Sequence, residues 1–181
     1  IDDEGLFTLK KRFDAKYLMP KGLLYDFLLS GNSQAKNALN KIYQASLAWD
    51  ENYNSKRGFW TERNQAAALN TAISYWEVSN DEAALVRINN IIDATVEMTF
   101  NPQDDWQLRG CPQHSFKSHE GWGDDSPACS PWMMALLGDA LWRFYQLTND
   151  KRAAALIDSF GDFILNYGLF YGDKRVKNIV I

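Results

Sequence analysis

Three short segments of the sequence share one pattern, and each separates two stretches of helical periodicity. They read Leu29-Ser30-Gly31-Asn32, Val78-Ser79-Asn80-Asp81 and Leu147-Thr148-Asn149-Asp150. The Gly or Asn at the third position suits the left-handed conformation that often ends a helix. The Asn or Asp that follows can cap the next helix. We therefore expect three tight αα-hairpins, and this repeat restricts the chain to tandem pairs of helices.

Apolar residues at helical spacing predict helices over 22–29, 33–49, 62–78, 82–98, 129–147 and 151–167. The apolar residues of 129–147 occupy more than one face, so we expect that helix to be buried on several sides. Trp76 and Trp142 fit the helical stripes and are expected in the core. No alternation typical of a core sheet is present. The sequence predicts one all-α domain over 1–181, with hairpins at about 22–49, 62–98 and 129–167.

Bulk composition excludes several classes of protein. A formal net charge of −4 gives no support for a basic nucleic-acid-binding face. No apolar run approaches the roughly 20 residues that span a bilayer. We therefore expect neither a nucleic-acid nor a membrane partner. The chain begins at Ile1 without a Met, from which we expect a piece of a longer protein.

The long segment at 100–128 interrupts the helical pattern and concentrates reactive side chains. It contains both histidines of the chain and two Asp-Asp pairs, and the two cysteines lie in it or next to it. A polar loop of this length inside a compact domain is usually functional or disordered. Its richness in aromatic residues argues against disorder. We therefore expect this loop to form the functional site.

Tandem αα-hairpins with these turns resemble the six-hairpin (α/α) toroid of many glycoside hydrolases and polysaccharide lyases. The resemblance covers about residues 22–168. It implies that the helices at 62–78 and 129–147 line the inside of a ring, and that the loops entering them bind sugar. A full toroid has six hairpins, so this chain corresponds to about half of one. A homo-oligomer or the remainder of a longer chain would then cover its open apolar faces.

The segment Gly121-Trp122-Gly123-Asp124-Asp125-Ser126 resembles two families within that superfamily. An Asp-Asp-Ser run precedes an inner helix in unsaturated glucuronyl hydrolases, and adjacent aspartates are catalytic in bacterial endo-α-mannanases. The sequence departs from both families. Pro127-Ala128-Cys129-Ser130 replaces the Trp-Ala-Arg-Gly segment of the first, and the Trp that follows the pair in the second occurs only at Trp132. The resemblance therefore extends to the superfamily and to neither family.

Asp124, Asp125 and His119 are the predicted catalytic residues. Cleavage of a glycosidic bond commonly uses two carboxyl groups, one as acid and one as base or nucleophile. Adjacent carboxylates raise the pKa of one of them, which suits an acid. The alternative is that the aspartates only cap the following helix. His119 could act as a general base or orient substrate, or it could be a loop histidine bonded to backbone.

The predicted substrate-binding residues are aromatic, basic or imidazole side chains near the ends of the helices. Flat aromatic faces suit the C–H faces of sugars, and paired arginines could clamp a uronic carboxylate. Core packing and surface salt bridges are the alternatives. Glu62, Arg63 and Asn64 are expected to face the same mouth. The predicted set is Trp60, Arg63, Trp106, Arg109, His114, Trp122 and Trp132.

The two cysteines leave two interpretations open. A Cys111–Cys129 disulfide would enclose the histidines and would indicate export. A zinc site from these cysteines with His114 and His119 is conceivable, although the spacing fits no common zinc signature. We expect no metal and no cofactor.

The resemblance implies a carbohydrate-active enzyme that acts on an oligo- or polysaccharide, most simply a glycoside hydrolase. One alternative is a polysaccharide lyase, in which His119 and a tyrosine such as Tyr53 abstract a proton while Arg109 neutralises a uronate. Another alternative is a non-catalytic helical-repeat module that binds a glycan or a protein. For a carbohydrate-active protein the expected location is periplasmic or secreted.

Overall fold

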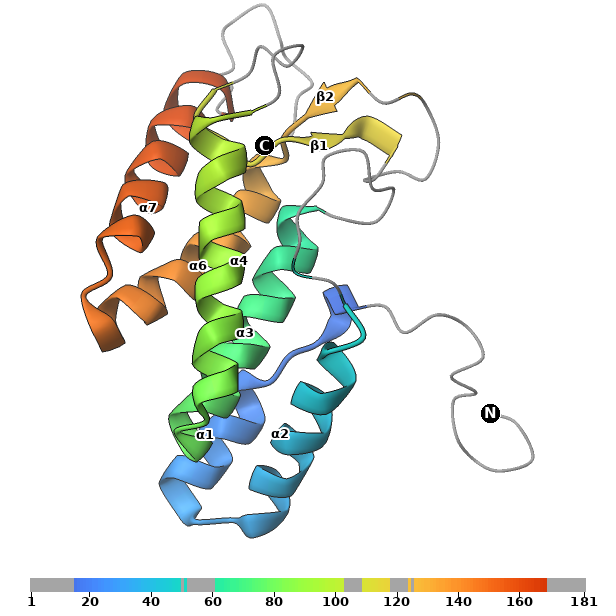
Figure 1. Cartoon of the computed structure of the whole chain (residues 1–181), viewed down its shortest axis with the longest axis vertical. Coiled ribbons are helices and arrows are strands. Elements are labelled where there is room, and N and C mark those ends of the chain that lie inside the picture. The colour runs from blue at the N-terminus through green and yellow to red at the C-terminus, as the bar shows by residue number, and fades with distance from the viewer. Residues whose placement is uncertain are drawn as a thin grey trace, which may run out of the picture.

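The computed structural model describes residues 15–49, 51, 61–102, 109–117, 124 and 126–168 (Figure 1). These residues are mostly helical, so the predicted all-α class is confirmed. Their helices are η1 (Ala15–Tyr17), α1 (Lys21–Ser30), α2 (Ser33–Ser46), α3 (Glu62–Ser79), α4 (Glu82–Phe100), α6 (Pro131–Thr148), α7 (Lys151–Phe163) and the π-helical turn η2 (Ile164–Gly168). None of the described helices has both the length and the apolar composition needed to cross a bilayer.

The three repeated turns adopt the backbone conformations that the sequence predicts. Gly31, Asn80 and Asn149 have positive φ angles of 71°, 53° and 58°. The residue after each of them caps the next helix through a side-chain oxygen. Asn32 accepts from the N–H of Gln34, Asp81 from that of Ala83, and Asp150 from those of Arg152 and Ala153. In each turn one residue ends a helix and its neighbour begins the next.

Helix α3 is the centre of the molecule. It packs against α1, α2, α4, α6 and η1, and α7 packs against α4 and α6 (Figure 1). Small side chains at Ala66, Ala67, Ala68 and Ala72 are buried in α3 and let its neighbours approach closely. The core consists of aliphatic and aromatic side chains from these helices, chiefly Leu69, Ile73, Ile88, Ile91, Ile92, Met134, Leu137, Leu141, Phe144, Leu156 and Phe160.

The prediction that the helix at 129–147 is buried on several sides is wrong. In α6, Trp132 and Trp142 are 52% and 49% exposed. The prediction that Trp142 lies in the core is therefore also wrong. Its ring stacks on Tyr145 of the same helix, with centroids 5.7 Å apart. Apolar periodicity indicates which faces of a helix could be buried. In the structure, α3 and α7 cover only part of α6, so its remaining apolar residues are exposed. Trp76 does pack against the core, edge-on to Phe144.

The described part of the loop between α4 and α6 contains a short antiparallel pairing. Strand β1 (His114–Ser115) pairs with β2 (Pro127–Ala128), with His114 opposite Ala128. A Cys111–Cys129 disulfide lies next to this pairing, with the Cα atoms 6.3 Å apart. In Figure 1 the two strands lie at the end of the molecule where α3 begins. The two strands are therefore close to the first turn of α3.

Helix α1 exposes large apolar side chains. Of its apolar residues only Leu24 is fully buried, whereas Tyr25, Leu28 and Leu29 are 51%, 54% and 88% exposed. Such a face agrees with the expectation that the chain is part of a larger assembly, because contiguous apolar patches usually contact another surface. The partner surface remains a prediction.

Candidate functional site

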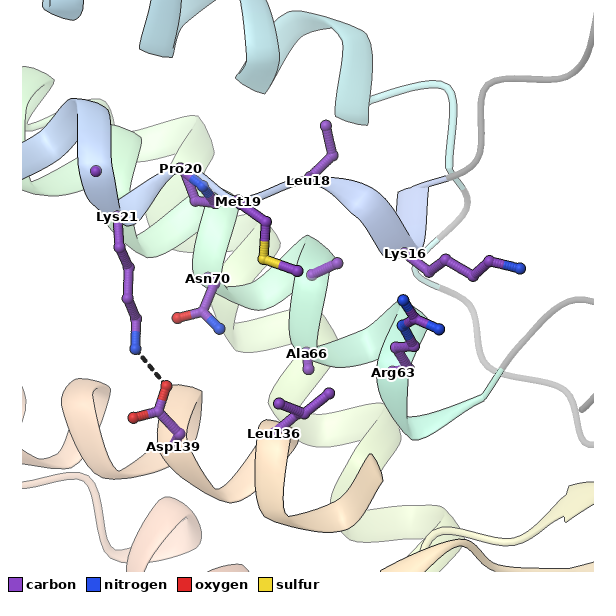
Figure 2. A pocket seen from close by; sticks show the side chains of 12 residues that line it. Lys16, Leu18, Met19, Pro20, Lys21, Arg63, Ala66, Asn70, Leu136 and Asp139 are labelled. Atoms are coloured by element: carbon purple, nitrogen blue, oxygen red, sulfur yellow. Dashed lines mark hydrogen bonds and ion pairs between the residues drawn. The ribbon is translucent and has the colours of Figure 1, made fainter. Parts of the chain in front are cut away.

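A pocket of about 190 Å³ lies between the N-terminal segment, α3 and α6 (Figure 2). The N-terminal segment contributes Lys16 and the run from Leu18 to Gly22. Helix α3 contributes Arg63, Ala66, Ala67 and Asn70, and α6 contributes Leu136 and Asp139. Most of the wall is apolar, and the polar groups are few and separated, which is the usual composition of a small-molecule site.

Arg63 lies between two exposed aromatic rings at one end of the pocket. Its guanidinium carbon is 5.0 Å from the ring centroid of Tyr17 and 5.6 Å from that of Trp132. Both distances suit cation–π attraction. Tyr17 ends η1, Arg63 is in the first turn of α3 and Trp132 is in the first turn of α6. The fold thus unites two predicted substrate-binding residues, Arg63 and Trp132, with a tyrosine that the sequence did not single out.

An ion pair forms another wall of the pocket. Lys21 of α1 donates to Asp139 of α6 (Figure 2). One turn further along α6, Arg143 pairs with Glu77 of α3, and its guanidinium is 5.8 Å from the Tyr25 ring. These contacts hold the α1 segment across α3 and against α6. They fix the geometry of the pocket through side chains from three separate helices.

Glu62 occupies a fully buried position at the start of α3. One carboxylate oxygen accepts the backbone N–H of Ser130 at 3.0 Å. The other lies 2.9 Å from Nδ1 of His114, which is also fully buried. Ser130 is the N-cap residue of α6. The Glu62 carboxylate therefore joins the first turn of α3, the first turn of α6 and strand β1.

The prediction that Glu62, Arg63 and Asn64 face one common mouth is wrong. Glu62 and Asn64 are buried, and Arg63 alone of the three lines the pocket. Successive residues of a helix are about 100° apart around its axis, so three in a row cannot share one direction. Trp132 is likewise exposed beside Arg63, while its neighbour Met133 is buried.

Asp124 is exposed and makes a local turn. Its carboxylate accepts the backbone N–H of Ser126 at 2.9 Å. Hydrogen bonds from Ser126, first from its side chain and then from its backbone, lower the pKa of Asp124. Such a carboxylate is ionised and suits a base or a nucleophile better than a proton donor. Asp124 does not cap α6, because the N-cap residue of that helix is Ser130.

The remaining predicted site residues are only partly placed. His114 is buried against Glu62, and Arg109 is exposed at the start of the described loop segment. Tyr53, Trp60, Trp106, His119, Trp122 and Asp125 lie outside the described residues.

The zinc interpretation does not fit the structure. Cys111 and Cys129 form a disulfide, which removes both thiolates from any metal site. In the part of the chain that the structure describes, no group of three or more His, Cys, Asp and Glu side chains is arranged to hold a metal ion.

Sequence reasoning missed several residues of the pocket and of the aromatic cluster beside it. Tyr17, Lys21 and Asp139 carried no signal, because a lone aromatic or charged residue on a helix is usually an ordinary surface residue. Asn70 carried a weak one, since an Asn inside an otherwise alanine-rich helix has low helix propensity. None of these residues is near the loop at 100–128 in sequence.

A scan of protein-family models, a search of curated proteins and a search of solved structures each found no match to this chain.

Proposed function

We propose that this chain is part of a carbohydrate-active enzyme, most simply a glycoside hydrolase. In this proposal its helix pairs are three hairpins of an (α/α) toroid, with α3 and α6 on the inside of the ring. The observation that carries the proposal is the cluster of Arg63, Tyr17 and Trp132 beside the pocket. This cluster stands where two of the proposed inner helices begin, the end at which toroid enzymes bind sugar.

The chemistry of the cluster suits a glycan. The exposed rings of Tyr17 and Trp132 offer flat apolar faces for the C–H face of a sugar, while Arg63 offers N–H donors for its oxygens. Hydrolysis would use the aspartate pair of the loop. Asp124, with its lowered pKa, would act as base or nucleophile, and Asp125 would be the proton donor.

A second candidate function is a polysaccharide lyase. Lys21 is paired with Asp139, whereas Arg63 has no acidic partner among the described residues. A positive excess of this kind favours an anionic, uronate-containing glycan. The non-catalytic alternative would use the same surface without turnover.

We propose a periplasmic or secreted location. The Cys111–Cys129 disulfide supports it, since such bonds persist in oxidising compartments and are rare in the cytosol.

The binding part of the proposal is tested with a matched pair of tryptophan variants. Trp132→Ala removes a ring of the cluster, and Trp142→Ala removes an equally exposed ring two to three turns further along α6. We expect Trp132→Ala to weaken oligosaccharide binding about tenfold, which corresponds to an aromatic contact of about 1.4 kcal/mol. Trp142→Ala should bind like the wild type. Equal affinities for both variants across neutral and uronate-containing oligosaccharides, measured by calorimetry, would remove the support of the cluster.

The catalytic part requires turnover assays on the glycans that bind. New reducing ends without ultraviolet absorbance indicate a hydrolase, and absorbance from an unsaturated uronate indicates a lyase. For a hydrolase, Asp125→Asn should abolish most turnover and leave binding nearly intact, because the amide keeps the shape but cannot donate the proton. Binding without any turnover would instead favour the non-catalytic module.

A further inference from the structure

The pocket beside the cluster is small, and its wall is mostly apolar. Its volume of about 190 Å³ is below the roughly 300–1,000 Å³ of sites for drug-sized ligands. Met19, Ala66 and Leu136 contribute much of its apolar wall. In Figure 2, Met19 and Leu136 lie on opposite sides of Ala66. A single small ring fits this space, whereas an oligosaccharide does not.

Arg63 supplies a positioned cation at one end of the pocket. Within the described part of the chain, its guanidinium contacts two rings and has no acidic partner. Its N–H groups donate no hydrogen bond to any residue that the structure describes. A planar guanidinium with available N–H groups matches a carboxylate, which it can bind through two parallel hydrogen bonds.

Asn70 supplies a second polar group, and among the described residues this group lacks a hydrogen-bond donor. Its side-chain oxygen is buried and has no hydrogen-bond partner among the described residues. A buried acceptor without a donor destabilises a fold, so a ligand that donates a hydrogen bond here gains binding energy. Figure 2 shows the Asn70 amide between the Lys21–Asp139 pair and Arg63.

The Lys21–Asp139 pair determines where a negative charge can bind. Asp139 already neutralises Lys21, so this wall offers no excess positive charge. The positive charge without an acidic partner among the described residues is that of Arg63, at the other end of the pocket (Figure 2). A carboxylate is therefore directed to Arg63, and the hydroxyl groups of the same ligand are directed to Asn70 and Asp139.

We propose that this pocket binds one hydroxylated carboxylate ring, such as a single sugar-acid unit, with the carboxylate on Arg63 and a hydroxyl donating to Asn70. Its identification as part of a glycan rests on the proposed function. The pocket itself requires only a small hydroxy acid. The pocket would thus select an acidic unit, while Trp132 and Tyr17 contact the adjoining part of the glycan.

The test compares two free sugars that differ in one group. D-glucuronate and D-glucose are titrated into the whole chain, and binding is followed by ligand-observed NMR. We expect wild type to bind D-glucuronate at least tenfold more tightly than D-glucose. Arg63→Gln should remove this preference, and Arg63→Lys should restore part of it. Asn70→Ala should weaken binding of both sugars, whereas Asn37→Ala, at an exposed position of α2, should change neither affinity.

Two outcomes overturn the proposal: equal affinity of wild type for the two sugars, or D-glucuronate binding that survives in both Arg63→Gln and Asn70→Ala. Thermal melting of every variant identifies loss of binding caused by unfolding, and Arg63→Lys retains the charge between the rings if Arg63→Gln does not fold. If one of these two outcomes is found but oligosaccharides still bind through Trp132, the subsite is wrong and the proposed function stands. If D-glucuronate binds as expected but no oligosaccharide binds or is cleaved, the proposed function is wrong and the subsite stands.

Discussion

Among single residues, Glu62 has the largest structural consequence. Two helix N-termini, those of α3 and α6, meet at its carboxylate, and each favours a negative charge through its unpaired N–H groups. His114 of β1 completes the set at 2.9 Å. A carboxylate in these surroundings is held by the fold, and in turn it holds the loop that carries Asp124 against the first turns of both helices.

Glu62→Gln tests this role at the residue scale. The amide oxygen can still accept from Ser130, but the charge that favours the two helix ends and His114 is lost. We expect the free energy of unfolding to fall by about 1–3 kcal/mol. Urea denaturation measures the effect.

The matched control is Glu82→Gln. Glu82 is the first residue of α4, so it has the same position in its helix as Glu62, but it is exposed. Its loss should change the stability by no more than about 0.3–1 kcal/mol. If the two variants are equally stable, the buried charge of Glu62 contributes no more to the free energy of unfolding than an exposed acid in the first turn of a helix.

Among the elements, the turn between α6 and α7 is tied to the rest of the fold by a charged network. Asp150 caps α7 and is hydrogen-bonded by Arg152. Arg152 also reaches Asp93 of α4 at 2.6 Å and the side-chain oxygen of Asn89. The cap of one helix thereby fixes the packing of α7 on α4.

This network makes part of the stability dependent on pH. The side-chain hydrogen bond from Arg152 is the main cause that lowers the pKa of Asp150, followed by backbone N–H groups of α7. A lowered folded-state pKa stabilises the fold above the unfolded pKa of about 3.9, and this contribution is lost as the pH falls through the folded value. Because the pair is partly exposed, we expect it to contribute at most about 1 kcal/mol.

Asp150→Asn isolates the charge, since Asn caps a helix about as well as Asp. The variant should be less stable than wild type at pH 7, and the difference should shrink as the pH falls below the unfolded pKa of about 3.9 and disappear once the folded Asp150 is protonated. Asp81→Asn is the control, because Asp81 caps α4 in the same way but has no arginine partner among the described residues. Chemical denaturation as a function of pH measures both. A constant difference between Asp150→Asn and wild type at every pH would contradict the assignment.

At the scale of the whole molecule, the disulfide connects the loop to the helical body. It joins positions separated by 18 residues, and β1, β2 and Asp124 lie between them in sequence. Cys111 is fully buried and packs with the core of the helices. The loop is therefore fixed at both ends, by the disulfide and by the contact of His114 with Glu62.

Reduction of this bond should destabilise the whole fold. A loop of this length corresponds to roughly 3 kcal/mol in the chain-entropy model. We expect a strong reductant to lower the free energy of unfolding of the wild type by that order. The Cys111→Ala, Cys129→Ala double variant should resemble the reduced wild type and show no response to reductant. If reduction leaves the wild type unchanged, the loop is held by its other contacts.

The sequence by itself determined the local structure. Its hydrophobic period defined the helices to within a few residues, and the Gly or Asn followed by Asn or Asp determined the three turns, because positive φ and helix capping depend on residues next to one another in the chain. The sequence also drew attention to Arg63, Trp132 and the Asp124 turn.

What only the tertiary structure decided is which faces of the helices meet. Three residues far apart in sequence, Tyr17, Arg63 and Trp132, form one cluster. Glu62 is fully buried although Arg63 beside it is only half-buried, and Trp142 lies at the surface. Burial and long-range pairing depend on which helices cover which faces, and a periodic pattern contains no information about its neighbours in space.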